Sequence, residues 1–415
     1  MSKEDKNFYK SGNKKFDEGD YQGAIDDYTK AIELDSKNPE FYIKRGEIKG
    51  FKLYDFQGAI DDFTKAIELD PKNVRAWRSR GAAKRRIQLI YFMDDYQGAI
   101  DDNSKAIELD PTNSESISDR GEFKYYLSDF QGAIDDYTKA IELDPKNIRA
   151  WSFRASSKQH LKDYQGAFDD YSKAIELDPE NPKKYIARGD LKHQINYFQG
   201  AFDDYSKAIE LDPKNLDTYI SIASTKFSSG DYKGAIDDYT KAIELDPKDT
   251  YAWRYRGAAK QGLNNFQGAI DDYTKAIELD PKDIYAWRYR GAVKRGLNNF
   301  QGAIDDYTKV IELDPEDPEF YIKRGEIKGS KLEDFQGAID DYTKAIELDP
   351  EDPEFYIKRG EIKGSKLEDF QGAIDDYTKA IELTTSETDK KHILELRSKA
   401  YQMLSKIDLD NSQRL

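Results

Sequence analysis

Apolar side chains recur at steps of three and four residues through a segment that is repeated along the chain. In one copy these positions are Phe266, Ala269, Ile270, Tyr273, Ala276 and Ile277. Such spacing places them on one face of a helix, here called helix B. The opposite face carries Asp271, Asp272, Lys275 and Glu278. We expect that face to be solvated, with Asp271 and Lys275 forming an ion pair one turn apart.

A second helical segment, here called helix A, precedes each helix B and in the same copy covers residues 251–263. It carries a bulky Trp253 and, four residues later, Gly257, a small residue that lets two helices approach closely. An Asn or Asp precedes every helix A after the first and is expected to cap it. These residues are Asn38, Asn73, Asn113, Asn147, Asn181, Asn215, Asp249, Asp283, Asp317 and Asp352.

Turns separate the helices at regular places. All 13 prolines fall at the junctions between repeats, so none interrupts a helix. Ten of the eleven copies of helix B are preceded by Asp or Asn, and Tyr197 is the exception. A second set of caps is therefore expected at the start of helix B.

The glycine of helix B marks the period of the repeat. It occurs at Gly23, Gly58, Gly98, Gly132, Gly166, Gly200, Gly234, Gly268, Gly302, Gly337 and Gly372. The spacing is 34 residues in six of the ten intervals, 35 in three and 40 in one. The predicted hairpins span about 5–36, 39–71, 74–111, 114–145, 148–179, 182–213, 216–247, 250–281, 284–315, 318–350 and 353–383.

A single helical hairpin buries too little apolar surface to fold alone, so stability must come from stacking. The sequence therefore predicts an all-α fold, an α-solenoid in which antiparallel helical hairpins stack into a right-handed superhelix.

One copy of the unit resembles the tetratricopeptide repeat. The matching residues, in order, are Trp253, Gly257, Phe266, Ala269, Tyr273, Ala276 and Pro281. The pattern returns in phase eleven times, from Phe8 to about Leu383. The resemblance implies that helix A lines an inner groove, and that the groove binds peptides or partner proteins.

Nine units depart from the family by carrying Arg where it usually has Leu, before the small residue of helix A. They are Arg45, Arg80, Arg120, Arg154, Arg188, Arg256, Arg290, Arg324 and Arg359. We expect each guanidinium to lie between helices and meet the repeated Asp-Asp pair, for example Asp271 or Asp272 near Arg290. The alternative is an arginine ladder for an acidic ligand. The glycine of helix B also departs from the family, and either close backbone approach or duplication history would explain it.

The end of the chain and one insertion differ from the repeat. Residues 384–415 are predicted to form a capping helix and a short tail, opened by Ser386 and Asp389. Its apolar stripe is Ile393, Leu396, Ala400, Leu404 and Ile407. The insertion adds six residues around Lys84–Met93, as extra turns or an elbow that folds back on its neighbour or docks a partner.

Composition narrows the class of protein. Among 415 residues, 65 Lys and Arg against 81 Asp and Glu give a net charge of −16, which disfavours nucleic acid or an acidic membrane as the main ligand. The absence of cysteine fits a reducing compartment, and no apolar run approaches the length of a membrane span. We expect a cytoplasmic protein, monomeric, without cofactor or metal.

No catalytic motif stands out. The chain has no phosphate-binding glycine loop, and its three histidines lie in different units. We expect no enzyme but a scaffold that holds partner proteins or peptides, with a helical-repeat RNA-binding protein as the alternative. The candidate groove residues are Arg75, Arg78, Tyr251, Arg254, Tyr285, Arg288 and Arg295. An acidic or carboxylate-bearing segment would suit them around Tyr251–Arg295.

Overall fold

The computed structural model describes residues 3–91 and 96–414, and this part of the chain forms helices and turns without a strand. The chain divides into two compact units, Met1–Pro213 and Lys214–Leu415. The first contains α1 (Lys3–Asp17), α2 (Tyr21–Leu34), α3 (Pro39–Phe51), α4 (Phe56–Leu69), α5 (Val74–Tyr91), α6 (Tyr96–Leu109), α7 (Ser114–Tyr126), α8 (Phe130–Leu143), α9 (Ile148–His160), α10 (Tyr164–Leu177), α11 (Pro182–Gln194) and α12 (Phe198–Leu211). The second contains α13 (Leu216–Ser228), α14 (Tyr232–Leu245), α15 (Thr250–Gly262), α16 (Phe266–Leu279), α17 (Ile284–Gly296), α18 (Phe300–Leu313), α19 (Pro318–Lys331), α20 (Phe335–Leu348), α21 (Pro353–Lys366), α22 (Phe370–Leu383) and α23 (Glu387–Arg414).

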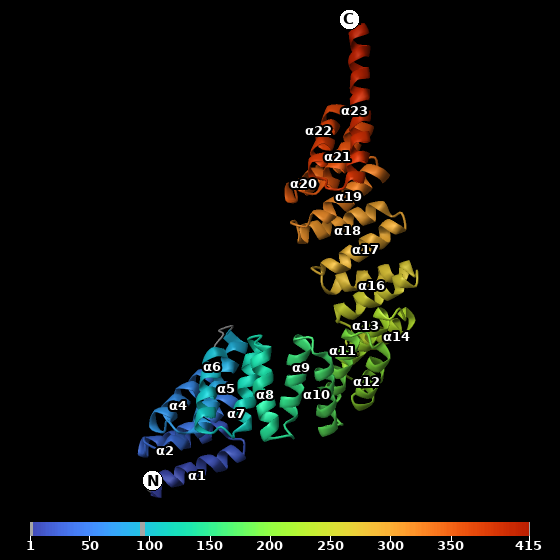
Figure 1. The fold of residues 1–415 in the computed structure, drawn as a ribbon. Helices are drawn as coiled ribbons and strands as arrows, with labels where there is room; N and C mark the ends of the chain where they lie inside the picture. The colour runs from blue at the N-terminus through green and yellow to red at the C-terminus, as the bar shows by residue number, and fades with distance from the viewer. Residues whose placement is uncertain (1–2, 92–95, 415) are drawn as a thin grey trace. The chain divides into compact units, whose positions relative to one another are not determined.

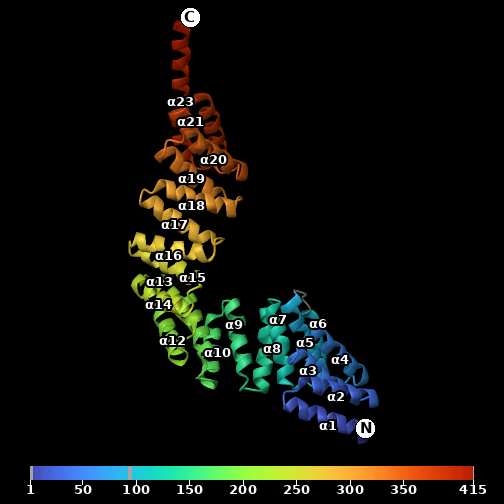
Figure 2. The same ribbon diagram turned by 180° about the vertical axis from the view of Figure 1, so that it is seen from behind.

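The predicted alternation of helix A and helix B is confirmed from α1 to α22. Odd-numbered helices are A helices, even-numbered helices are B helices, and each A helix packs against the B helix that follows it. Within each unit a B helix also packs against the next A helix, as α4 does against α5 and α20 against α21. The hairpins of a unit therefore form a stack, which Figures 1 and 2 show from opposite sides. This is the α-solenoid that the sequence predicts.

Side-chain caps fix where the helices begin. All ten Asn and Asp residues predicted before helix A accept a hydrogen bond from a backbone N–H of the first turn. Nine of the predicted caps of helix B do the same, and the tenth, Asp95, lies outside the described residues. Tyr197 makes no such bond, as its side chain predicts.

The interior of the stack contains alanines and, in ten of the eleven B helices, an aromatic ring at the position of Tyr273, which Asn103 occupies in α6. Ala269, Tyr273 and Ala276 of α16 are fully buried. Gly257 of α15 lies so close to the Tyr273 ring that a methyl group at this position would be 2.9 Å from it. The small residue of helix A is therefore required by the aromatic residue of helix B, as the spacing predicts.

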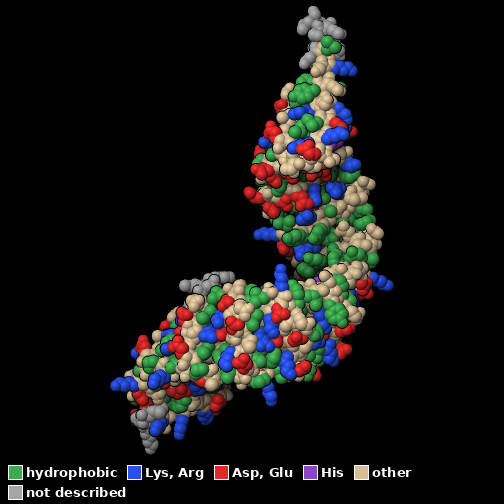
Figure 3. Space-filling model, in the orientation of Figure 1, with side chains coloured by type: hydrophobic (Ala, Val, Ile, Leu, Met, Phe, Trp, Pro, Cys, Tyr) green, Lys and Arg blue, Asp and Glu red, His purple; other side chains and the backbone are tan. Residues whose placement is uncertain are grey.

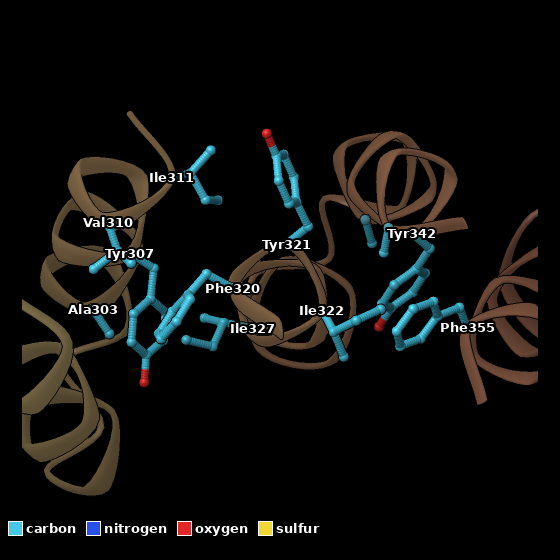
Figure 4. Close-up of a cluster of buried hydrophobic side chains, with 12 residues drawn as sticks. Ala303, Tyr307, Val310, Ile311, Phe320, Tyr321, Ile322, Ile327, Tyr342 and Phe355 are labelled. Carbon is cyan, nitrogen blue, oxygen red and sulfur yellow. The ribbon is translucent and has the colours of Figure 1, made fainter. Parts of the chain in front are cut away.

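Each A helix inside the stack is buried on two sides. In Figure 4, Phe320 and Ile327 of α19 point toward Tyr307 of the preceding α18, while Ile322 points toward Tyr342 of α20 and Phe355 of α21. The Phe320 and Tyr307 ring centroids are 5.8 Å apart. One helix thus belongs to two layers of the core, which is how neighbouring hairpins complete each other's interior.

The glycine of helix B lies close to its own capping side chain. In α20, Gly337 donates its N–H to the Asp334 carboxylate at 3.0 Å, and an added methyl group would be 2.2 Å from the same carboxylate. The close approach that the sequence left open is therefore between this backbone and the capping side chain.

The insertion lengthens α5, and the C-terminal segment forms a helix of its own, α23. α5 continues to Tyr91, whereas Phe92 and Met93 of the inserted apolar run lie outside the described residues. α23 packs against α22, with Ile393 and Ala400 buried. The Asp389 N–H donates to the Ser386 hydroxyl at 3.4 Å, so the predicted start of this helix is confirmed.

Candidate partner-binding surface

The charged face of helix B is not solvated throughout, and that prediction was wrong for the second aspartate of each pair. Asp272 is 2% exposed, because its carboxylate lies against helix A of its own hairpin. The predicted Asp271–Lys275 pair does not form. Asp271 accepts a hydrogen bond from Gln267 at 2.9 Å, and Lys275 pairs instead with Glu278 at 3.0 Å.

All nine arginines of helix A bind this buried aspartate through two nitrogens. The Nε to Oδ2 distances are 2.8–3.0 Å and the Nη2 to Oδ1 distances are 2.6–2.7 Å. Nη1 donates to a Thr or Ser of the preceding helix B at 2.9–3.3 Å. A lysine one turn along helix A faces the same carboxylate at 2.7–3.1 Å. We call this set of contacts the arginine fork.

The partner expected for Arg290 needs correcting. Its fork holds Asp306 of its own hairpin, at 2.7 and 3.0 Å, while Asp272 is held by Arg256. From the preceding hairpin Arg290 reaches Thr274, at 2.9 Å. The guanidinium lies over the Trp287 ring at 4.7 Å from its centroid, so its charge is satisfied and shielded within the stack.

Two hairpins lack the fork and show what it does. In the first, Ser11 replaces the arginine and donates to Asp27 at 2.7 Å. Burial acts to raise the pKa of the Asp27 carboxyl, but the hydrogen bonds from Lys15 and Ser11 hold it below its usual value. In the seventh hairpin Ile222 donates nothing, and burial raises the pKa of the Asp238 carboxyl although Lys226 lies 2.6 Å from it.

Successive A helices within a unit also approach one another directly. The pairs are α3 with α5, α5 with α7, α7 with α9, α13 with α15, and α15 with α17. We call the surface formed by their outward side chains the A face. In the first unit it carries the predicted residues Arg75 and Arg78, and in the second it carries the predicted residues Tyr251, Arg254, Tyr285, Arg288 and Arg295.

The predicted arginines of the first unit bind acidic residues of neighbouring A helices. Arg75 donates to Glu47 at 2.6 and 2.8 Å and to Glu40 at 3.1 Å. Burial acts to lower the pKa of Arg75, but the two carboxylates raise it. Arg78 pairs with Glu115 and, at 2.8 Å, with Asp119. These groups pair with one another across the A face, although 44% of the Arg75 side chain and 65% of the Glu115 side chain stay exposed.

The predicted arginines of the second unit are paired as well. Arg254 donates to Asp283 at 2.7 Å, and Tyr251, Tyr255 and Tyr285 place their ring centroids 5.2–5.7 Å from its guanidinium. Arg288 lies 3.3 Å from Glu319, and Arg295 lies 3.8 Å from Glu326. These last two pairs are looser than that of Arg254.

The predicted residues of the second unit differ in how much of each side chain is exposed. Arg254 is largely enclosed, with 17% of its side chain exposed, whereas Tyr285 is 54% exposed and Arg288 and Arg295 are about half-exposed. Asp283, which the sequence marked only as a helix cap, is also the carboxylate that binds Arg254. No spacing rule along one helix could have shown that role, because it joins two hairpins.

Two hollows open on the A face. One, of about 470 Å³, is lined by residues of α3, α5 and the start of α7, including Phe51, Arg75 and Arg78. The other, of about 420 Å³, is lined by residues of three successive A helices, including Arg295 from α17, Ile322 from α19 and Phe355 from α21. In Figure 3, Asp and Glu side chains gather beside α18 to α20.

The described residues form neither a metal site nor a membrane-spanning helix. Within residues 3–91 and 96–414, no three His, Asp or Glu side chains come together as metal ligands would. Over the same residues, no helix combines the length and apolar character needed to cross a bilayer.

Comparison with known proteins gives consistent sequence matches. Models of the tetratricopeptide repeat match residues 12–49, 39–73, 119–182, 185–215, 223–264, 250–283 and 331–365, which together are more than half of the chain. No curated protein sequence matches the chain.

Several solved structures resemble the chain. The crystal structure of MamA is 27% identical over 41% of this chain and 92% of that chain, with a TM-score of 0.38. Yeast Tom70 is 19% identical over 97% and 96%, with a TM-score of 0.39. YrrB, described as a TPR protein with an unusual peptide-binding site, is 20% identical over 45% and 97%, also with a TM-score of 0.39.

Proposed function

Since the chain belongs to the tetratricopeptide repeat family, we propose that it is a non-catalytic scaffold that holds partner proteins or peptide segments on its A face. The observation that carries this proposal is the hollow of about 420 Å³, to which three successive hairpins contribute. A surface built from several hairpins suits an extended ligand better than a small molecule, because its side chains are spread along the stack. The cysteine-free sequence supports the cytoplasm as the compartment.

Within the second unit, we propose that Tyr285, Arg288 and Arg295 contact the partner. Tyr285 offers an exposed ring for stacking. Arg288 and Arg295 are held loosely by glutamates, so a carboxylate of the partner can replace Glu319 or Glu326 at little cost. Tyr251 and the enclosed Arg254 lie beneath this surface, with the Arg254 guanidinium against the Tyr285 ring.

Photo-crosslinking in cells tests the proposal. A benzophenone amino acid replaces Tyr285 in one chain and Tyr197 in another, because the two tyrosines are equally exposed, at 54% and 55%, and Tyr197 lies at a turn, before α12. We expect protein adducts at position 285 and few at position 197. Equal adducts at both positions would contradict a role for the A face, and nuclease-sensitive adducts at 285 would favour RNA as the ligand.

A charge-reversal pair identifies the contacting residues. Arg288→Glu with Arg295→Glu is expected to reduce the adducts at position 285 at least severalfold, since it removes both exposed cations. The control is Lys309→Glu with Lys344→Glu, the same change in charge on exposed positions of B helices. Loss of adducts in the control alone would reject this site.

A further inference from the structure

A stretch of twelve residues occurs with the same sequence in α3 and α21. Pro39–Gly50 and Pro353–Gly364 both read PEFYIKRGEIKG. Each stretch carries two glutamates seven residues apart, which places them two turns apart on one side of the helix. In α3 these are Glu40 and Glu47, and in α21 they are Glu354 and Glu361.

In α3 the two glutamates receive an arginine. The guanidinium of Arg75, from the next A helix, binds both oxygens of Glu47 and one oxygen of Glu40. The glutamates of α19, at the same positions, are also met by cations: Glu319 by Lys323 and Arg288, and Glu326 by Arg295 and Lys358. The same sequence in the same kind of helix therefore binds a cation in both places.

In α21 the corresponding pair has no cation. No hydrogen bond or ion pair to the carboxylate of Glu354 or Glu361 is found among the described residues. α23, which follows, begins with Glu387 and Asp389 and carries no arginine before Arg397, whose guanidinium bonds to Thr378. Two carboxylates placed to receive an arginine therefore remain open.

A hollow adjoins Glu354, with an apolar floor and a rim of charged side chains that includes Arg295, Glu319, Lys323 and Glu326. Glu354 and Phe355 of α21 line it together with Pro318 and Ile322 of α19. Phe355 and Ile322 belong to the core, so the floor of the hollow is rigid. A ligand that places a charge on the glutamates can therefore also bury an apolar side chain beside them.

We propose that α21 binds an arginine of a partner protein, in a segment where an apolar residue lies next to the arginine. Glu354 and Glu361 would hold the guanidinium as Glu40 and Glu47 hold that of Arg75. A lysine suits this site less well, because the glutamates are about 10 Å apart along the helix axis and a single ammonium cannot reproduce the forked contact. The inference rests on the proposed function, since it assigns one partner chemistry to one part of the A face.

The test uses the full chain and fluorescein-labelled peptides of sequence GSRLSG, with lysine or citrulline replacing arginine in matched peptides. Fluorescence anisotropy is expected to show saturable binding of the arginine peptide and at least fivefold weaker binding of the other two. Glu354→Gln with Glu361→Gln should weaken the arginine peptide about tenfold. Glu351→Gln with Glu368→Gln, the same charge change on exposed residues outside this face, should leave it unchanged.

A second variant tests the comparison with α3. Arg75→Ala removes the arginine from Glu40 and Glu47 and leaves Lys44 3.8 Å from Glu47, so calorimetry is expected to find a second, weaker arginine-peptide site per chain. Circular dichroism checks that each variant keeps its helices. The inference is overturned if the arginine peptide does not bind, if the α21 variant binds as tightly as the parent chain, or if Arg75→Ala adds no site.

The outcomes also separate this inference from the proposed function. Crosslinks at position 285 together with a silent α21 variant would leave the scaffold standing and remove the arginine site. Analytical ultracentrifugation of the chain alone tests the other possible occupant of the site, which is a second copy of this chain. Self-association that Glu354→Gln with Glu361→Gln abolishes would identify a second copy of this chain and overturn the proposed partner.

Discussion

Among single side chains, the arginine fork is a buried charge contact that recurs in nine of the eleven hairpins. A buried carboxylate is costly unless charge and hydrogen bonds compensate it, and each fork supplies two bonds together with a nearby lysine. The arginine also binds a hydroxyl of the preceding hairpin, so it contributes both within a hairpin and between neighbours. The nine arginines are therefore part of the architecture of the stack.

Removing one member of the fork is expected to destabilise the stack strongly. Arg290→Leu leaves Asp306, 1% exposed, with Lys294 as its remaining cation. We expect a loss of about 3 kcal/mol, because the buried carboxylate keeps its desolvation cost. Thermal unfolding followed by circular dichroism measures the effect. Arg290→Leu with Asp306→Leu should recover most of the loss, and an unchanged midpoint for the single variant would show that the fork adds no stability.

The seventh hairpin offers the opposite experiment. Ile222→Arg places a fork beside Asp238, whose pKa burial raises. A raised pKa means that the folded chain binds the proton more tightly than the unfolded chain, so stability falls as the pH rises through that range. The arginine should stabilise the fold by about 1 kcal/mol at neutral pH, and by less at acidic pH, because protonation of the carboxyl removes the charge that the arginine binds.

Thermal midpoints at pH 4 and pH 7.5 measure this difference, and hydrogen exchange in α13 and α14 shows whether it is local. Ile222→Leu serves as the control, since it keeps the apolar character but donates no hydrogen bond. An arginine variant that is less stable than the parent at pH 7.5 would contradict the interpretation of Asp238. Asp231 and Asp237 also act to raise its pKa, so both should be kept.

The helices show why the stack needs an end. The A helices α3 to α11 and α15 to α21 each pack against a B helix on both sides, whereas α23 packs against α22 among the described helices. Its stripe divides accordingly: Ile393 and Ala400 are buried, Leu396 and Leu404 pack at the edge, and Ile407 is 37% exposed. α23 therefore covers the core of the last hairpin with its first turns.

Two neighbouring residues of α23 test this division. Ile393→Ala is expected to cost about 2–4 kcal/mol, since it leaves a cavity against α22. Leu394→Ala, one residue along but 43% exposed, should cost less than about 0.5 kcal/mol. Urea unfolding compares the two variants. Equal effects would mean that α23 does not cap the stack as described.

Across the whole chain, the repeats agree in their buried layers and differ on the A face. Alanines, the aromatic ring of helix B and the caps recur almost unchanged. The A face, in contrast, has arginine-rich helices such as α5 and α17 and glutamate-rich helices such as α3 and α19. The chain therefore pairs its own opposite charges between hairpins, and the net charge of −16 does not describe any single part of the A face. Partner selection is expected to depend on the few positions where this pairing is incomplete.

Much of the fold followed from local rules. The 3.6-residue periodicity located the helices, and the Asn and Asp caps marked where they begin, because both depend on residues within one or two turns. The pairing of the small Gly257 with the Tyr273 ring was likewise predictable in kind. The different roles of Asp271 and Asp272 were not predictable, since the sequence of two adjacent aspartates does not tell which carboxylate faces the neighbouring helix.

The sequence alone determined the helices, their caps, their number and the need to stack, because these depend on contacts along the chain and on a strict repeat. Tertiary structure decided which charges are satisfied. It placed Asp306 with Arg290, Asp283 with Arg254, and Glu47 with Arg75. Among residues 3–91 and 96–414 it gave Glu354 and Glu361 no cation. The physical reason is that charges interact through space, so their partners depend on how hairpins lie against one another.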